Sequence, residues 1–249
     1  MIAALGMYDR AEVQGANDRL WALIRDRLRA GNLPAPDGLT RGDLAYMPGW
    51  LRPDLVLGQT CGYPYRARLH GKVALIGTPD YGVEGCAPGH YRSVLVARAG
   101  DPRDIAAFNG IQIAYNDPLS QSGWAAPQTH AAKLGLHFPA GLQTGAHIAS
   151  ARAVAEGRAD LAALDAVTWG MIQDHDPDLG ATLRVAALTE PAPGLPYIAA
   201  LGADAEATFA AVSDAIANLS AADRVLLHLK SLIRIPAEAY LAVPTPSSP

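Results

Sequence analysis

The residues best suited to binding a small anion lie in one stretch, Tyr115–Trp124, which contains Ser120, Ser122 and Gly123. An apolar run, Ile111–Ala114, precedes it and a helical pattern follows, so the sequence predicts a strand, a turn and a helix N-terminus. The first N–H groups of a helix have no partner within it and carry the positive end of its dipole. With two hydroxyls beside them, these groups would form a site for an oxyanion.

No lysine or arginine lies within this stretch, so an anion held there would depend on neutral donors. Such a site suits a reversible binder better than an enzyme that transfers phosphoryl groups, which needs concentrated positive charge. The alternative is that the serines only cap a helix, which is an ordinary role for serine. The stretch by itself leaves both interpretations open.

Composition excludes several classes of function. The chain has 249 residues, half of them hydrophobic, and a formal net charge of -4. Nucleic acid is disfavoured as a partner because a phosphate backbone requires a basic surface. No apolar run is long enough to span a membrane, and no Cys/His cluster has the spacing of metal ligands. There is also no nucleophile elbow, phosphate-binding loop or dinucleotide fingerprint. We therefore expect no membrane-spanning segment, no metal and no cofactor.

The start of the chain and its two cysteines bear on the compartment. No charged segment followed by an apolar segment and a cleavage site is present, as a secretory leader would require. We expect either a cytoplasmic chain, if Met1 is the native start, or a mature form in which a methionine replaces the leader. Cys61 and Cys86 each follow a predicted strand, and they are compatible with a disulfide or with two buried free thiols.

Strand and helix signals alternate along the chain, which predicts α/β architecture with mainly parallel sheets. The pattern occurs in two series joined by two crossings. It predicts two lobes with a ligand cleft between them, one formed by residues 1–97 and 197–249 and the other by residues 98–196. The length is sufficient for two modest cores.

In open α/β sheets, ligands bind beyond the carboxyl ends of the strands. Candidate residues occur at five such ends: Tyr8, Gln59–Tyr63, Ser120–Trp124, Ala146–His147 and Asp165. Any α/β fold offers junctions of this kind, so each candidate also has a structural interpretation. His147 has the alternative of a capping or surface residue, Asp165 that of a helix N-cap, and Tyr63 that of a turn aromatic.

The order of these residues resembles the phosphate-, phosphite- and phosphonate-binding proteins of ABC importers. The resemblance covers nearly the whole chain and is most specific in Ser120–Gly123 and in the spacing from His147 to Asp165. The segments that carry it are Tyr8, Gln59–Gly62, Gly85–Gly89, Tyr91–Ser93, Asn116–Trp124, Gly145–His147 with Ser150, and Ala162–Asp165 with Trp169. Proteins of this family are type II periplasmic binding proteins, which close two α/β lobes on a ligand.

The resemblance implies roles for the second-lobe residues. Ser120, Gln121 and Ser122 would hold the oxygens of a phosphate or phosphonate through hydroxyls and helix N–H groups. His147 would donate to an oxyanion oxygen, and Asp165 would face an amine or hydroxyl of the ligand.

In the first lobe the resemblance implies ligand contacts from Gln59 and Thr60, and from Tyr8 and Tyr63 as aromatics that close over the ligand. It also implies a periplasmic location and an ABC permease as partner. The chain departs from the family in having no leader peptide and no clear second carboxylate for an aminoalkyl ligand.

We therefore expect a non-catalytic solute-binding protein for a small phosphorus oxyanion or organophosphonate. The alternative is an enzyme on the same scaffold, similar to menaquinone- and thiamine-pathway proteins, acting on a small carboxylate or phosphorylated metabolite. His147 and Asp165 would then be its acid/base residues. A third interpretation, a detached sensor lobe of a kinase or cyclase, is weaker because no signalling module is fused.

Overall fold

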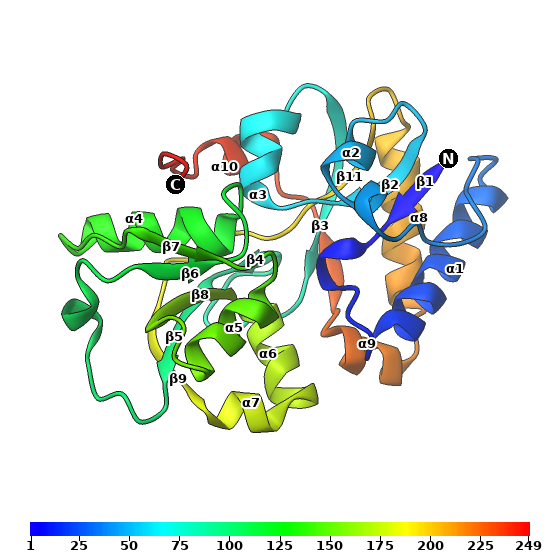
Figure 1. Cartoon of the computed structure of the whole chain (residues 1–249). Coiled ribbons are helices and arrows are strands. Elements are labelled where there is room, and N and C mark those ends of the chain that lie inside the picture. Colours follow the sequence, from blue (N-terminus) through cyan, green and yellow to red (C-terminus); the bar gives the residue numbers. More distant parts are fainter. The chain divides into compact units, whose positions relative to one another are not determined.

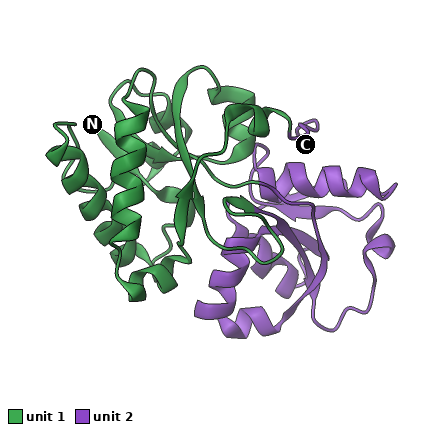
Figure 2. Ribbon diagram, turned by 180° about the vertical axis from the view of Figure 1, so that it is seen from behind, with its two compact units in different colours: residues 1–90, 193–242 green, residues 91–192, 243–249 purple.

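The computed structural model describes residues 1–249 and divides into two compact units (Figure 2). Unit 1 comprises Met1–His90 and Pro193–Ala242, and unit 2 comprises Tyr91–Ala192 and Val243–Pro249. The chain therefore passes between the units three times. The passages include β4 (His90–Tyr91) and β10 (Ala192–Pro193), which form a two-stranded sheet.

Unit 1 is built on a five-stranded sheet with the order β1-β2-β11-β3-β12 (Figure 1). Its strands are β1 (Ile2–Ala4), β2 (Leu55–Gln59), β3 (Val73–Asp80), β11 (Tyr197–Ala200) and β12 (Ser231–Ile233). β1 and β2 are parallel, whereas β11 runs antiparallel to both of its neighbours.

Helices cover both faces of the unit 1 sheet. On one face lie α1 (Gln14–Ala30), α8 (Ala205–Ala217) and α9 (Ala221–Leu227). In α1, Leu20, Ile24 and Leu28 are spaced by four residues and point into this core, as an amphipathic helix requires. On the other face lie η2 (Asp43–Ala45), α2 (Met47–Trp50), α3 (Gly62–Pro64) with the π-helical η3 (Tyr65–Leu69), and α10 (Ala237–Leu241).

Unit 2 has its own five-stranded sheet, with the order β7-β6-β8-β5-β9. Its strands are β5 (Ser93–Arg98), β6 (Ile113–Tyr115), β7 (Ala140–Gln143), β8 (Leu161–Asp165) and β9 (Leu183–Leu188). β6 is parallel to β7 and β8, whereas β5 runs antiparallel to β8 and β9. One face packs against α5 (His147–Ala155), α6 (Ala166–His175) and α7 (Pro177–Ala181), and α4 (Ala126–Lys133) lies over the other (Figure 1).

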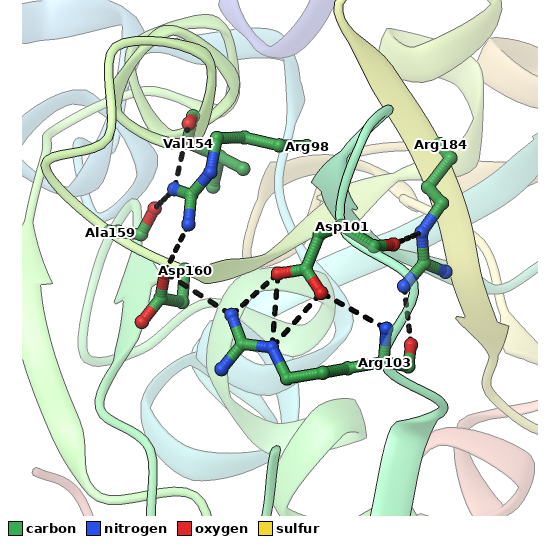
Figure 3. A network of polar contacts seen from close by, with 7 residues as sticks. All are labelled: Arg98, Asp101, Arg103, Val154, Ala159, Asp160 and Arg184. Atoms are coloured by element: carbon green, nitrogen blue, oxygen red, sulfur yellow. Dashed lines mark hydrogen bonds and ion pairs between the residues drawn. The ribbon is translucent and has the colours of Figure 1, made fainter. Parts of the chain in front are cut away.

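A network of arginines and aspartates holds the segment between β5 and β6, which contains η4 (Ile105–Phe108) (Figure 3). The Asp101 carboxylate accepts from the backbone N–H of Arg103 at 3.0 Å and from its guanidinium, which lowers the pKa of Asp101. Arg184 of β9 donates to the backbone oxygens of Asp101 and Arg103. Arg98 bonds Asp160 and two backbone carbonyls in and after α5. These bonds fix the end of the sheet opposite to the candidate site.

Two sequence-based expectations differ from the structure. The sheets are mixed and not mainly parallel, and β5 belongs to unit 2, although the sequence placed residues 91–97 in the first lobe. An apolar run marks a buried strand but does not identify its partners. Because β5 and β11 each follow a passage between units, no crossover helix has to precede them, and they are free to pair antiparallel.

The remaining features concern the thiols and the membrane. Cys61 and Cys86 are thiols that form no disulfide, and Cys61 is buried. None of the helices combines the length and the apolar character that crossing a membrane demands.

Candidate functional site

The carboxyl ends of three neighbouring strands meet at one edge of the unit 2 sheet. The strands β7, β6 and β8 are adjacent and parallel, so the residues that follow them share this edge. Ser120–Gly123 follow β6, His147 follows β7, and Asp165 ends β8. The fold thus brings together the three segments that the sequence singled out in its second half.

Ser120 begins the turn after β6. It is the N-cap of η5 (Gln121–Ala125), a π-helical turn, and its Oγ accepts from the N–H of Gly123 at 2.9 Å. The capping interpretation therefore holds for Ser120. A hydroxyl that accepts one hydrogen bond still has its own proton to donate, so capping does not exclude a ligand contact. Ser120, Gln121 and Ser122 are all buried.

Gly123 allows the turn to close against the end of β6. A Cβ at this position would lie 1.9 Å from Oδ1 of Asn116. The requirement is therefore steric, because any side chain would force Asn116 away. Oδ1 of Asn116 is buried and has no hydrogen-bond partner.

Ser122 and His147 join the turn to the next strand end. Ser122 Oγ lies 2.9 Å from Nε2 of His147. His147 is the first residue of α5, whose N-cap, Ala146, supplies no side-chain hydrogen bond. The loop before it is held by the N–H groups of Thr144 and Gly145, which donate to the carbonyls of Tyr115 at 2.9 Å and Asn116 at 3.0 Å. The hydrogen bond therefore links two segments that are already fixed.

His147 is held neutral by its surroundings. Burial of the ring lowers its pKa to about 4, and the backbone of Ala163 partly offsets this effect. Nδ1 is buried and makes no hydrogen bond of good geometry, although part of the residue remains exposed. At neutral pH the ring is thus an uncharged donor or acceptor.

Asp165 is the N-cap of α6. Its Oδ1 accepts from the N–H groups of Val167 at 2.7 Å and Thr168 at 3.2 Å. The structural interpretation of Asp165 is therefore correct, and its contact with a ligand stays a prediction. Ser93 lies directly opposite Asp165 in the β5–β8 pair and was not among the predicted site residues. Its long-range pairing leaves no signal in the local sequence.

In unit 1, Tyr8 and Gln59 pack together around a tyrosine that the sequence analysis missed. The ring of Tyr81, just after β3, meets Tyr8 edge to face at 5.0 Å, and its OH accepts from Nε2 of Gln59 at 2.9 Å. Tyr197 of β11 lines the same cavity, and burial raises its pKa. The cavity holds only about 10 Å³, which is roughly the space that one water needs.

The other two unit 1 candidates, Thr60 and Tyr63, are buried beside β2. Thr60 N–H donates to Pro196 O at 3.0 Å, but its Oγ1 has no partner. The guanidinium of Arg66 lies 4.7 Å from the centre of the Tyr63 ring, a cation–π geometry that accounts for this aromatic within the fold.

A sequence model of the family described as "ABC transporter, phosphonate, periplasmic substrate-binding protein" matches residues 54–237, well over half of the chain. The chain belongs to this family. Phosphonate-family proteins bind solutes without transforming them, which confirms the expected non-catalytic function and disfavours the enzyme alternative. Among curated protein sequences, none matches.

Solved structures confirm the fold that the phosphonate family implies. XAC2383 from Xanthomonas citri bound to chloride is 15% identical, with a TM-score of 0.72 and coverage of 96% of this chain and 92% of that chain. PhnD1 from Prochlorococcus marinus in complex with methylphosphonate is 18% identical, with a TM-score of 0.70 and coverage of 96% and 93%. PA3383 from Pseudomonas aeruginosa, a binding protein component of an ABC phosphonate transporter, is 17% identical, with a TM-score of 0.66 and coverage of 93% and 80%. The chain therefore has the predicted α/β type II periplasmic-binding-protein fold.

Proposed function

We propose that this chain binds a small phosphorus oxyanion, either phosphate, phosphite or an organophosphonate, at the β6–β7–β8 edge of unit 2. Ser120, Gln121, Ser122 and His147 would donate to its oxygens, together with N–H groups of the η5 turn and of α5. The observation that carries this proposal is the Ser122–His147 hydrogen bond, because it joins the ends of two strands in a place where neighbouring polar atoms are unmet.

Buried polar atoms that lack hydrogen-bond partners support a ligand at this edge. Of the buried side-chain atoms without a hydrogen-bond partner, Ser93 Oγ lies where β8 finishes and Asn116 Oδ1 lies directly after β6. A buried polar group without a partner costs about 1–3 kcal/mol. Such groups at one edge indicate a site that is completed by another molecule.

The charge of the site indicates the kind of anion. The turn contains no lysine or arginine, and His147 is neutral at pH 7. Neutral donors bind an anion by geometry, so binding should depend only weakly on salt, unlike binding to a basic surface. The methylphosphonate in PhnD1 supports an organophosphonate as the first ligand to test.

The wider role follows from the family. We propose that the two units act as the lobes of a binding protein, that ligand shifts their conformational equilibrium, and that an ABC permease recognises the bound state. Tyr8, Gln59, Thr60 and Tyr63 of unit 1, and Asp165 of unit 2, are proposed as further ligand contacts. The family description supports a periplasmic location.

The first test is titration calorimetry of the purified chain with phosphate, phosphite, methylphosphonate and aminoethylphosphonate. We expect saturable binding of at least one of the four, with little change between 50 and 300 mM salt, roughly the range over which surface charges become screened. No heat and no thermal shift with any of them would overturn the proposal.

The second test replaces Ser122 by alanine. We expect the affinity for the bound ligand to fall roughly 10- to 100-fold, because a hydrogen bond to a charged group contributes about 1.5–3 kcal/mol. For Ser120→Ala we expect a loss of about 1 kcal/mol of folding free energy, because this substitution removes an N-cap.

Ser220→Ala is the matched control for loss of a cap. Ser220 Oγ accepts from the N–H of Asp223 at 3.1 Å at the start of α9 in unit 1. This variant should lose a similar amount of stability and keep full affinity. If Ser122→Ala also keeps full affinity, the site has been placed at the wrong strand ends.

A further inference from the structure

The hydroxyl of Ser93 has no role within the fold of unit 2. Ser93 is only 1% exposed, and its Oγ has no hydrogen-bond partner. The backbone of the residue is fully used, since its N–H donates to Thr189 Oγ1 at 2.9 Å and its carbonyl accepts from the N–H of Thr189 at 3.0 Å. The main chain therefore explains the strand position but not the side chain.

Strand register places this hydroxyl at the candidate site. Ser93 and Asp165 are direct partners in the antiparallel β5–β8 pair, so their side chains project from the same face about 5 Å apart at Cβ. Ala162 and Leu164 of β8 face the core formed with α5 and α6. Because side chains alternate along a strand, Asp165 and Ser93 project from the opposite face. That is the face on which α4 lies (Figure 1), and η5 packs against β8.

An unmet hydroxyl in such a place is costly. A buried hydroxyl without a partner loses about 1–3 kcal/mol relative to water, whereas alanine in the same position loses nothing of this kind. If Ser93 only filled space, its replacement by alanine would stabilise the fold. The cost is offset if a bound molecule supplies the missing partner.

We propose that Ser93 contacts the ligand of this site, donating its hydroxyl proton to an oxygen of the bound oxyanion beside Asp165. This inference rests on the proposed function and adds a donor from a fourth strand. Donors from β5 and from the segments after β6 and β7 approach from different directions. They therefore match the oxygens of a tetrahedral oxyanion better than those of a planar carboxylate.

The test compares Ser93→Ala with wild type, using methylphosphonate as the probe, followed by phosphite and phosphate. Calorimetry should show affinity reduced roughly tenfold or more for the oxyanion that wild type binds, as expected when a hydrogen bond to a charged group is lost. The Tm of the ligand-free variant should be equal to or higher than that of wild type, because an unmet hydroxyl has been removed.

Thr208→Val is the control for a hydroxyl that the fold does use. Thr208 is 4% exposed and its Oγ1 donates to Asp204 O at 2.7 Å in unit 1. We expect a lower Tm and unchanged affinity. Ser93→Cys, which keeps the shape of the side chain but is somewhat larger and a weaker donor, should bind with intermediate affinity and serves if the alanine variant does not fold.

The outcomes separate this inference from the proposed function. If wild type binds none of the three probes, the proposed function fails and this inference fails with it. If wild type binds and Ser93→Ala binds equally well, only this inference is overturned. A ligand-free Ser93→Ala whose Tm falls as far as that of Thr208→Val would show that the hydroxyl is satisfied within the fold, which also overturns it.

Discussion

The surroundings of His147 strongly shift its pKa. Burial lowers its pKa to about 4, from an ordinary value near 6.5. Its Nε2 bonds Ser122, so the charge of the ring decides whether that hydroxyl acts as donor or acceptor. A neutral ring keeps both options available at neutral pH.

The shifted pKa predicts how stability depends on pH. Above pH 6.5 the ring is neutral in both the folded and unfolded states, so it has no effect. As pH falls from 6.5 to about 4, the unfolded chain binds a proton that the folded chain excludes, and stability is lost; below pH 4 the loss stops. The total should be up to about 3 kcal/mol.

Chemical denaturation at several pH values measures this effect. His147→Gln should flatten the curve between pH 6.5 and 4, and the same substitution at the exposed His137 is the control for removing a histidine. Equal slopes for wild type and His147→Gln would show that the ring is accessible to protons in the folded state.

At this scale the sequence identified residue types well and their partners poorly. The serine-rich turn and His147 were predicted, and the structure joins them by a hydrogen bond. Ser93 and Tyr81 were missed because pairing between distant strands brings them to the candidate residues. A single sequence carries no local signal of such pairing.

Among the elements, the η5 turn is the one that positions the site. Its π-helical geometry places Ser120, Gln121 and Ser122 within one turn, and Gly123 packs against Asn116 at its centre. The turn is therefore defined by a steric contact as well as by its cap.

Gly123→Ala should displace Asn116 and distort the turn. We expect a loss of about 1–3 kcal/mol of folding free energy, as in other overpacked sites, and weaker oxyanion binding. The double variant with Asn116→Ala should recover much of the lost stability, since the obstructing atom has been removed. Thermal unfolding and calorimetry of the two single variants and the double variant measure this coupling. Losses that simply add would mean that Asn116 does not define the turn.

Element boundaries followed the strength of the local pattern. Apolar residues recurring with helical period predict helices over about 16–29, 205–219 and 221–229, close to the observed α1, α8 and α9. The short strand β12 was missed, since three residues carry no periodicity, and β7 was missed because its side chains are mostly half-buried or exposed.

For the whole molecule, the course of the C-terminal residues differs most from expectation. The Pro- and Ser-rich end of the chain predicts a loosely held tail, and the sequence-based division placed it with residues 197–249 in the first lobe. Instead, Val243–Pro249 belong to unit 2, and the carbonyl of Ser247 accepts from Nε1 of Trp124 at 2.8 Å. Buried indole N–H groups need such a partner, and Trp124 is only 5% exposed.

Deleting residues 243–249 should therefore act through Trp124. We expect a loss of about 1 kcal/mol of folding free energy for the truncation. Trp124→Phe should lose a similar amount for the lost bond, and somewhat more for the smaller ring. The two changes together should cost less than their sum, because they remove the same bond. Urea denaturation of wild type, the truncated chain, Trp124→Phe and the combined variant measures these losses. Fully additive losses of folding free energy would contradict a shared interaction.

The position of Trp124 also provides an optical reporter. It is one of four tryptophans, it lies two residues after Ser122, and its ring contacts Tyr115 at 5.2 Å. Ligand docking on the turn changes the electric field and the solvation around this indole, so its emission should shift on titration. A version that keeps this fluorophore and replaces the other three by phenylalanine would follow occupancy in real time, with no label attached.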